Sequence, residues 1–113
     1  MIDIYGGPTP NVLKPLIALE EMGLAYQRLP VDIMKAETRT PEYLARFPAG
    51  QVPGVEFPDG RCLAQSNAII RHLARGSALL PDDPWTQAKI DEWLFWEQYS
   101  HEPTIAVCRF HMR

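Results

Sequence analysis

Three short segments of this 113-residue chain combine polar groups with an expected helix start or strand end. They are the loop from Gly7 to Asn11, the Val52-Pro53 step and the Gln65-Ser66 pair. The start of a helix presents free backbone N–H groups and a partial positive charge, so it readily binds anions. We therefore expect these segments to accept a small ligand with carboxylates at its ends and a central group whose negative charge needs stabilising.

The cysteines and histidines show no pattern of a metal or redox site. Cys62 and Cys108 lie far apart and no C-x-x-C occurs, so we expect neither a disulfide framework nor a dithiol redox site. The histidines at positions 72, 101 and 111 lack metal-ligand spacing with the cysteines. We expect no bound metal.

Apolar spacing and helix-breaking residues predict the first elements of the fold. Residues 2–5 alternate apolar and polar side chains, as a short strand does. A helix is expected from about Asn11, and Gly23 suits the left-handed position that closes it. Residues 25–32 are expected to form a second strand, which Pro30 restricts to a sheet edge.

The next elements complete an α/β domain. Residues 40–42 (T-P-E) are typical of a helix start, and residues 52–64 form a predicted β-hairpin around Asp59-Gly60. Ser66 is expected to cap a third helix. The order β-α-β-α-β-β-α over residues 1–77 predicts a mixed four-stranded sheet with helices on both faces.

The sequence changes character after this domain. We expect a linker at residues 78–84, and then a long helix in residues 85–113 that is the first helix of an incomplete all-helical domain. A helix that is apolar on several sides needs packing partners on several sides, so we expect the chain to be truncated or obligately assembled. The apolar residues concerned are Trp85, Ile90, Trp93, Leu94, Phe95, Trp96 and Tyr99.

Composition excludes several classes of partner. The formal net charge is -3 and no Lys/Arg cluster occurs, which argues against nucleic acid. No apolar run approaches about 18 residues, so no membrane span is expected. No secretory signal is visible at the N-terminus, and we expect a cytoplasmic protein.

Several segments together resemble the N-terminal domain of cytosolic glutathione transferases, of bacterial Nu-, theta- or beta-like type. They are I-D-I-Y, P-T-P-N, L-E-E-M-G-L-A-Y, V-P before a hairpin, and Q-S-N-A-I-I-R-H-L-A. The stretch W-x-x-W-E-Q-Y-S-H-E-P resembles the start of the second, helical domain of that family. The resemblance implies a thioredoxin-like domain that uses glutathione as a cosubstrate, and a homodimer at full length.

The resemblance also implies roles in holding glutathione. Pro53 is expected to follow a cis peptide bond, although a trans proline at a strand start is the simpler alternative, and the backbone of Val52 is expected to pair with the cysteinyl part of the ligand. Gln65 and Ser66 are expected to hold the γ-glutamyl end. Gln51, together with the arginine at position 39, is a further candidate for the glycyl carboxylate.

The residue that activates the thiol is less well defined. The resemblance of P-T-P-N to Nu-class and yeast-prion-related transferases favours Thr9 and Asn11, whose simpler role is to make a turn and cap the first helix. Tyr5 is the second candidate, and it could equally be a structural strand residue. The loop contains no cysteine, and Cys62 is expected to be a small buried apolar residue.

The resemblance implies a glutathione transferase of the detoxifying kind. The glutathione thiolate would attack an electrophile or exchange with a disulfide. The alternative is a non-catalytic glutathione-binding module or an inactive fragment of a transferase. The 113-residue chain is expected to be weakly active or inactive, because the electrophile site of the family needs a complete helical domain. The resemblance implies that Trp93, Trp96 and Tyr99 border that site, but the simpler interpretation, which we favour, places them in the core of a helix bundle.

Overall fold

The computed structural model describes residues 1–7 and 9–106 of the chain, so the predictions for Cys108 and His111 fall outside the described residues. The chain forms two compact units, the first from Met1 to Arg75 and the second beginning at Gly76. Among the described residues, no helix combines the length and the apolar character needed to cross a bilayer.

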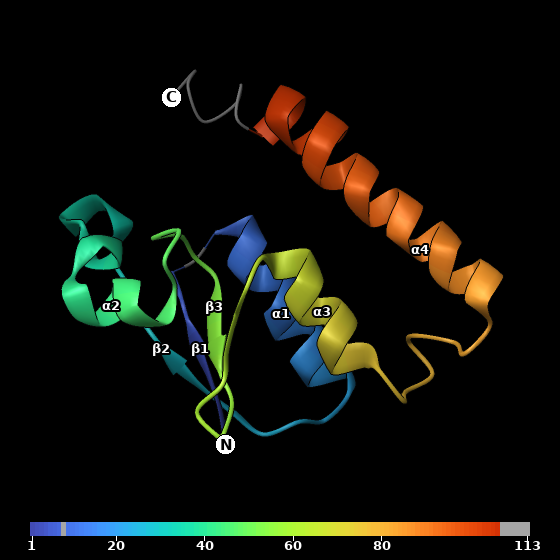
Figure 1. Cartoon of the computed structure of the whole chain (residues 1–113), viewed down its shortest axis with the longest axis horizontal. Helices are drawn as coiled ribbons and strands as arrows, with labels where there is room; N and C mark the ends of the chain where they lie inside the picture. Colours follow the sequence, from blue (N-terminus) through green and yellow to red (C-terminus); the bar gives the residue numbers. More distant parts are fainter. Residues whose placement is uncertain (8, 107–113) are drawn as a thin grey trace. The chain divides into compact units, whose positions relative to one another are not determined.

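The first unit is built on a four-stranded mixed sheet with the strand order β2-β1-β3-β4, of which Figure 1 labels β1, β2 and β3. Its strands are β1 (Ile2–Tyr5), β2 (Tyr26–Leu29), β3 (Gly54–Glu56) and β4 (Cys62–Ala64). β1 and β2 are parallel, whereas β1–β3 and β3–β4 are antiparallel. The predicted mixed sheet, the edge position of β2 and the hairpin are therefore confirmed.

Helices cover both faces of this sheet. α1 (Pro10–Glu21) and α3 (Ser66–Ala74) pack on one face, where Ile4 and Val55 are buried in a cluster with side chains of both helices. α2 (Pro41–Arg46) lies on the other face, after the short 3-10 turns η1 (Ile33–Lys35) and η2 (Glu37–Arg39). Successive strand residues point to opposite faces, so Tyr5 faces α2 while its neighbour Ile4 faces α1 and α3.

The helix termini follow the local sequence signals with two differences. Thr40 caps α2 by accepting the Tyr43 N–H at 3.2 Å, as predicted. α1 begins one residue early, at Pro10, because proline is well suited to the first helical position. The prediction that Ser66 caps α3 is wrong, since Ser66 is the first helical residue and Gln65 occupies the N-cap position.

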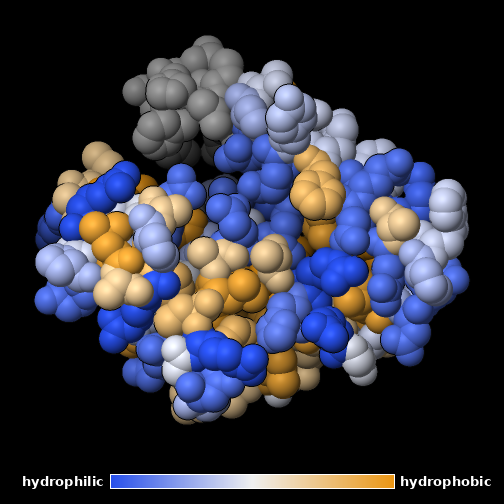
Figure 2. Space-filling view, in the orientation of Figure 1, coloured by the Kyte–Doolittle hydropathy of each residue, from blue (hydrophilic) through white to orange (hydrophobic). Residues whose placement is uncertain are grey.

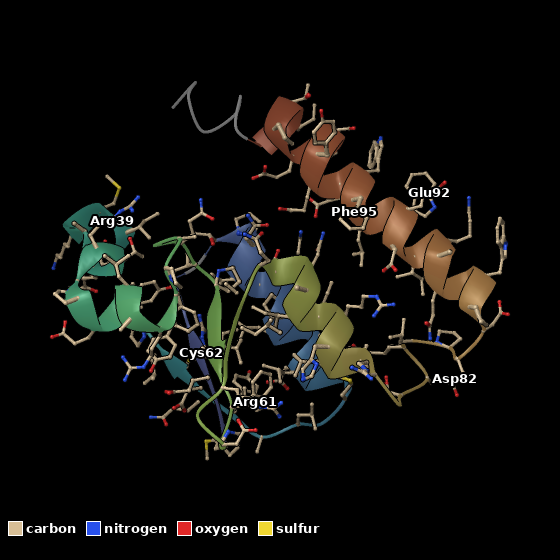
Figure 3. The ribbon with its side chains drawn as sticks, viewed as in Figure 1. Arg39, Arg61, Cys62, Asp82, Glu92 and Phe95 are labelled. Carbon is tan, nitrogen blue, oxygen red and sulfur yellow. The ribbon has the colours of Figure 1, made fainter. Side chains whose placement is uncertain are left out.

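The second unit contains α4 (Pro84–Trp96), which continues into the π-helical segment η3 (Glu97–Ala106). Asp83 caps α4 by accepting the Thr86 N–H at 2.9 Å. No residue of α4 is buried, and the exposed fraction is 73% for Trp85 and 74% for Phe95, which Figure 3 labels. The apolar side chains of α4 are thus unusually exposed.

Candidate functional site

The strand register brings the three predicted ligand segments to one end of the sheet. β1 ends at Tyr5, opposite Gly54 where β3 begins, and Gly54 lies opposite Ala64, where β4 ends. The ligand segments are the chain directly after β1, directly before β3 and directly after β4. Neighbouring strands are about 4.8 Å apart, so the segments together span roughly 10 Å. An extended tripeptide also spans roughly 10 Å.

A hollow of about 380 Å³ opens at this end of the sheet. It brings together Thr9 and Val52, two of the predicted site residues, although 43 positions separate them in the sequence. The chain between β2 and η1 and the residues of η1 form much of the remaining wall. The described lining residues are Gly7, Thr9, Pro30, Val31, Asp32, Ile33, Met34 and Val52.

The Val52–Pro53 peptide bond is cis, which confirms the expectation drawn from the resemblance. Pro53 and Gly54 are buried, whereas Val52 is half-buried and lines the hollow. The simpler alternative of a trans proline at the strand start is thereby excluded.

Thr9 stands at the N-cap position of α1, but its side chain makes no capping hydrogen bond. Its carbonyl oxygen accepts the N–H groups of Val12 and Leu13, both at 3.0 Å, so the backbone alone starts the helix. Asn11 is half-buried in the first turn of α1 and is not among the described residues that line the hollow. The geometry therefore favours Thr9 over Asn11 as a group that reaches a ligand there.

Tyr5 occupies a different environment, on the α2 face of the sheet. Its ring packs edge-on against Phe47, with the ring centroids 5.5 Å apart, and against Tyr43 at 6.1 Å. The guanidinium of Arg46 lies 6.0 Å from the centroid of the Tyr5 ring. Burial raises the pKa of Tyr5, and Arg46 partly opposes this shift. This arrangement fits the structural role that the sequence left open for Tyr5.

Gln65 and Ser66 form an unusual helix start. Gln65 has φ +74°, a backbone region that costs a non-glycine residue about 1–3 kcal/mol and that is common at ligand sites. Ser66 is only 4% exposed and is the first residue of α3. At this N-terminal end of the helix, the free backbone N–H groups and the helix dipole favour an anion. One turn of α1 is tied to this helix start, since Lys14 Nζ donates to Asn67 Oδ1 at 3.3 Å.

Arg39 lies against Gly50, the residue that precedes Gln51. The side chain of Gln51 is exposed. A Cβ atom on Gly50 would lie 2.8 Å from Nη1 of Arg39, so the guanidinium rests against the residue next to Gln51. Figure 3 shows Arg39 on the segment that precedes α2.

Cys62 is half-buried in β4, whereas a buried residue was predicted, because β4 is an edge strand. Burial raises the pKa of its thiol. It lines a second hollow, of about 430 Å³, together with His72, whose ring lies 5.2 Å from that of Phe57. Figure 2 shows hydrophobic side chains at the surface over this hairpin.

No group of three potential metal ligands occurs among residues 1–7 and 9–106.

Sequence reasoning missed Tyr43, which bonds to Gln51, the residue directly before the Val52-Pro53 segment. Its hydroxyl donates to the carbonyl oxygen of Gln51 at 2.6 Å. The spacing of eight residues matches no local motif, because the contact depends on how the chain folds back between α2 and β3.

Comparison with known proteins identifies the family to which this fold belongs. Residues 2–75 match the family described as "Glutathione S-transferase, N-terminal domain". The chain is 30% identical to glutathione S-transferase F9 of Arabidopsis thaliana, over 99% of this chain and 54% of that protein. It is similar in structure to a glutathione S-transferase of Pseudomonas fluorescens, with 44% identity and a TM-score of 0.94 over 96% of this chain and 55% of that one.

A third similarity concerns a protein with ligand bound. The chain is 28% identical, with a TM-score of 0.82, to a glutathione transferase homologue from Sulfitobacter that was crystallised with bound glutathione, over 96% of this chain and 56% of that one. The chain therefore spans about half the length of the relatives that it matches. With most of its first unit matched to the family's N-terminal domain, this chain belongs to the glutathione S-transferase family.

Proposed function

We propose that the chain binds reduced glutathione in an extended conformation across the end of the sheet. The γ-glutamyl carboxylate lies at Gln65 and Ser66, the cysteinyl backbone pairs with Val52, and the glycyl carboxylate lies near Gln51 and Arg39. The observation that carries this proposal is the strand register, which places the chain before β3 and the chain after β4 side by side at one end of the sheet. The Sulfitobacter homologue with bound glutathione supports the choice of ligand.

The proposed chemistry follows from where the thiol would lie. In this pose the ligand sulfur enters the hollow beside Thr9, whose hydroxyl is available as a donor to a thiolate. Stabilising the thiolate lowers the thiol pKa from about 8.5, so that more of the nucleophile is present at neutral pH. The sulfur then forms a bond to an electrophilic carbon and the leaving group departs with its electron pair, or it exchanges with a disulfide.

The wider context of this chemistry is also a proposal. We assign residues 1–77 to the glutathione-binding domain, 78–84 to a linker and 85–113 to the first helix of a helical domain. In a full-length protein of the relatives' size, the helical domain supplies the electrophile site, and two copies form a cytoplasmic homodimer. Glutathione is the cosubstrate, and the acceptor is a small electrophile or disulfide.

Titration with reduced glutathione, followed by amide NMR, tests the proposal. We expect the Val52 and Ser66 signals of the 113-residue chain to shift at millimolar ligand, because both backbones touch the ligand in the proposed pose. Signals from α4, in the second unit, serve as the internal reference. Val52 and Ser66 signals that do not move would contradict the proposal.

A serine substitution tests the γ-glutamyl end. Ser66→Ala should weaken glutathione binding at least tenfold, because hydrogen bonds to a charged group contribute about 1.5–3 kcal/mol. Ser77→Ala is the matched control, since it removes a hydroxyl that instead accepts the Leu79 N–H at 3.2 Å. Isothermal titration calorimetry gives both affinities, and equal affinities for Ser66→Ala and the unchanged chain would remove Ser66 from the site.

A further inference from the structure

The peptide unit between Gln51 and Val52 is held from the α2 side. The Tyr43 hydroxyl donates to the Gln51 carbonyl oxygen at 2.6 Å. That carbonyl and the Val52 N–H belong to one planar peptide unit, in which they point in opposite directions. Fixing the carbonyl toward α2 therefore fixes the N–H of Val52 away from α2.

Tyr43 is itself firmly placed. It is 5% exposed, and its ring packs against Phe47 with the centroids 5.0 Å apart. Its backbone N–H donates to Thr40 Oγ1 at 3.2 Å in the first turn of α2. A side chain already fixed by packing loses little further rotamer entropy when it makes the bond to Gln51.

The chain on either side of Gln51 is also packed against this region. A Cβ atom on Gly54 would lie 2.6 Å from the Phe47 ring, so the ring covers the start of β3. The Gly50 N–H donates to the Phe47 carbonyl oxygen at 2.9 Å. Residues 50–54 therefore take their position from α2 and the turn that follows it.

The hydroxyl of Tyr43 remains a donor at any physiological pH. Burial, and to a smaller extent the neighbouring Tyr5, raises the pKa of Tyr43 to about 12. The bond to the Gln51 carbonyl is thus present throughout the physiological pH range.

We propose that Tyr43 is a positioning residue of the glutathione site, which aims the Val52 N–H at the cysteinyl part of the ligand. This inference rests on the proposed function, and Tyr43 does not touch the ligand itself. Removing the hydroxyl leaves the Gln51 carbonyl without this donor and lets the peptide unit rotate. Affinity for glutathione should then fall about fivefold, as expected for one neutral hydrogen bond.

The experiment compares Tyr43→Phe with the unchanged 113-residue chain, by titration of reduced glutathione and by amide hydrogen exchange. Tyr26→Phe is the matched control, since Tyr26 donates its hydroxyl to Glu20 Oε1 at 2.6 Å and pairs with Ile2 at the opposite end of β1. We expect weaker binding and, at saturating glutathione, faster exchange at Val52 in Tyr43→Phe, with both quantities unchanged in Tyr26→Phe.

Hydrogen exchange at a core amide separates positioning from general destabilisation. A purely structural role for Tyr43 would accelerate exchange at Leu19 as much as at Val52 and would overturn the inference. Unchanged affinity in Tyr43→Phe, when the unchanged chain binds glutathione, would overturn the inference and leave the proposed function standing. No binding by the unchanged chain would instead overturn the proposed function, and this inference with it.

Discussion

At the scale of single residues, the site depends on a few groups with unusual surroundings. Thr9 has a hydroxyl that does not cap the helix it precedes, and it lines the hollow shared with Val52. Gln65 holds a backbone conformation that is costly for a residue with a side chain. Each feature weakens local structure, and each lies where the ligand is proposed to bind.

The role of Thr9 leads to a prediction about the bound thiol. Thr9→Val keeps the shape of the side chain but removes the donor, so the pKa of bound glutathione should rise by about 1–2 units. Ultraviolet absorbance of the thiolate, followed against pH at saturating glutathione, measures this pKa.

Two further substitutions make that measurement specific. Thr9→Ser retains a hydroxyl and should leave the thiol pKa low. Thr86→Val removes a hydroxyl that donates to Asp83 Oδ2 at 2.7 Å in α4, and it should have no effect. A thiol pKa that is the same in Thr9→Val and the unchanged chain would rule out Thr9 as the activating group.

At the scale of elements, α2 and the turn that follows it pack directly against β3. The ring of Phe47 is buried and lies over Gly54, which has no side chain to separate them. Arg46 ends α2 and Glu56 ends β3, and the two form an ion pair with 3.6 Å between Arg46 Nε and Glu56 Oε1. α2 is only six residues long, so its position depends on these tertiary contacts and on the Thr40 cap.

The contact between Phe47 and Gly54 can be measured by substitution. Gly54→Ala should lower the free energy of unfolding by about 1–3 kcal/mol, because the added methyl group overpacks a buried ring. Urea denaturation gives this quantity. Gly7→Ala is the control. A Cβ atom on Gly7 would lie 3.5 Å from the Val31 carbonyl oxygen, which is an ordinary van der Waals contact, so no overpacking is expected there.

A double mutant identifies the ring as the cause. Phe47→Leu makes room above Gly54, so the combined variant should lose less stability than the sum of the two single variants. Additive losses would show that the cost of Gly54→Ala arises elsewhere in the sheet.

At the scale of the whole molecule, the two units differ in how well they cover their apolar side chains. The first unit buries residues from all three of its helices and from its sheet in two clusters. In the second unit, Trp93 is 60% exposed and Tyr99 is 86% exposed. These aromatic side chains are therefore not enclosed in this chain.

This difference predicts the activity of the 113-residue chain. It should bind glutathione weakly and conjugate it only slowly to a chlorinated aromatic acceptor, because the electrophile has no enclosed site. Initial rates with and without the chain measure this activity, and the Ser66→Ala variant gives the background rate. Rapid turnover that Ser66→Ala abolishes would contradict the prediction, whereas binding without turnover fits a non-catalytic glutathione-binding module.

Much of the fold follows from the sequence because its signals are local. Gly23 has φ +65° just after α1, the Asp59-Gly60 turn joins β3 and β4, and Thr40 caps α2, as their residue types predict. The start of α3 was misplaced by one residue, because the positive φ of Gln65 is unfavourable for its residue type and cannot be predicted from local preference.

The sequence by itself determined the order of the elements, the family and the segments that were candidates for binding. Only the tertiary structure decided which candidates meet, because the strand register places Tyr5, Gly54 and Ala64 side by side although they are distant in sequence. It also turned Tyr5 toward α2, since neighbouring strand residues face opposite sides of a sheet. The hydrogen bond from the Tyr43 hydroxyl to the Gln51 carbonyl requires the chain to fold back between α2 and β3, so no local sequence pattern predicts it.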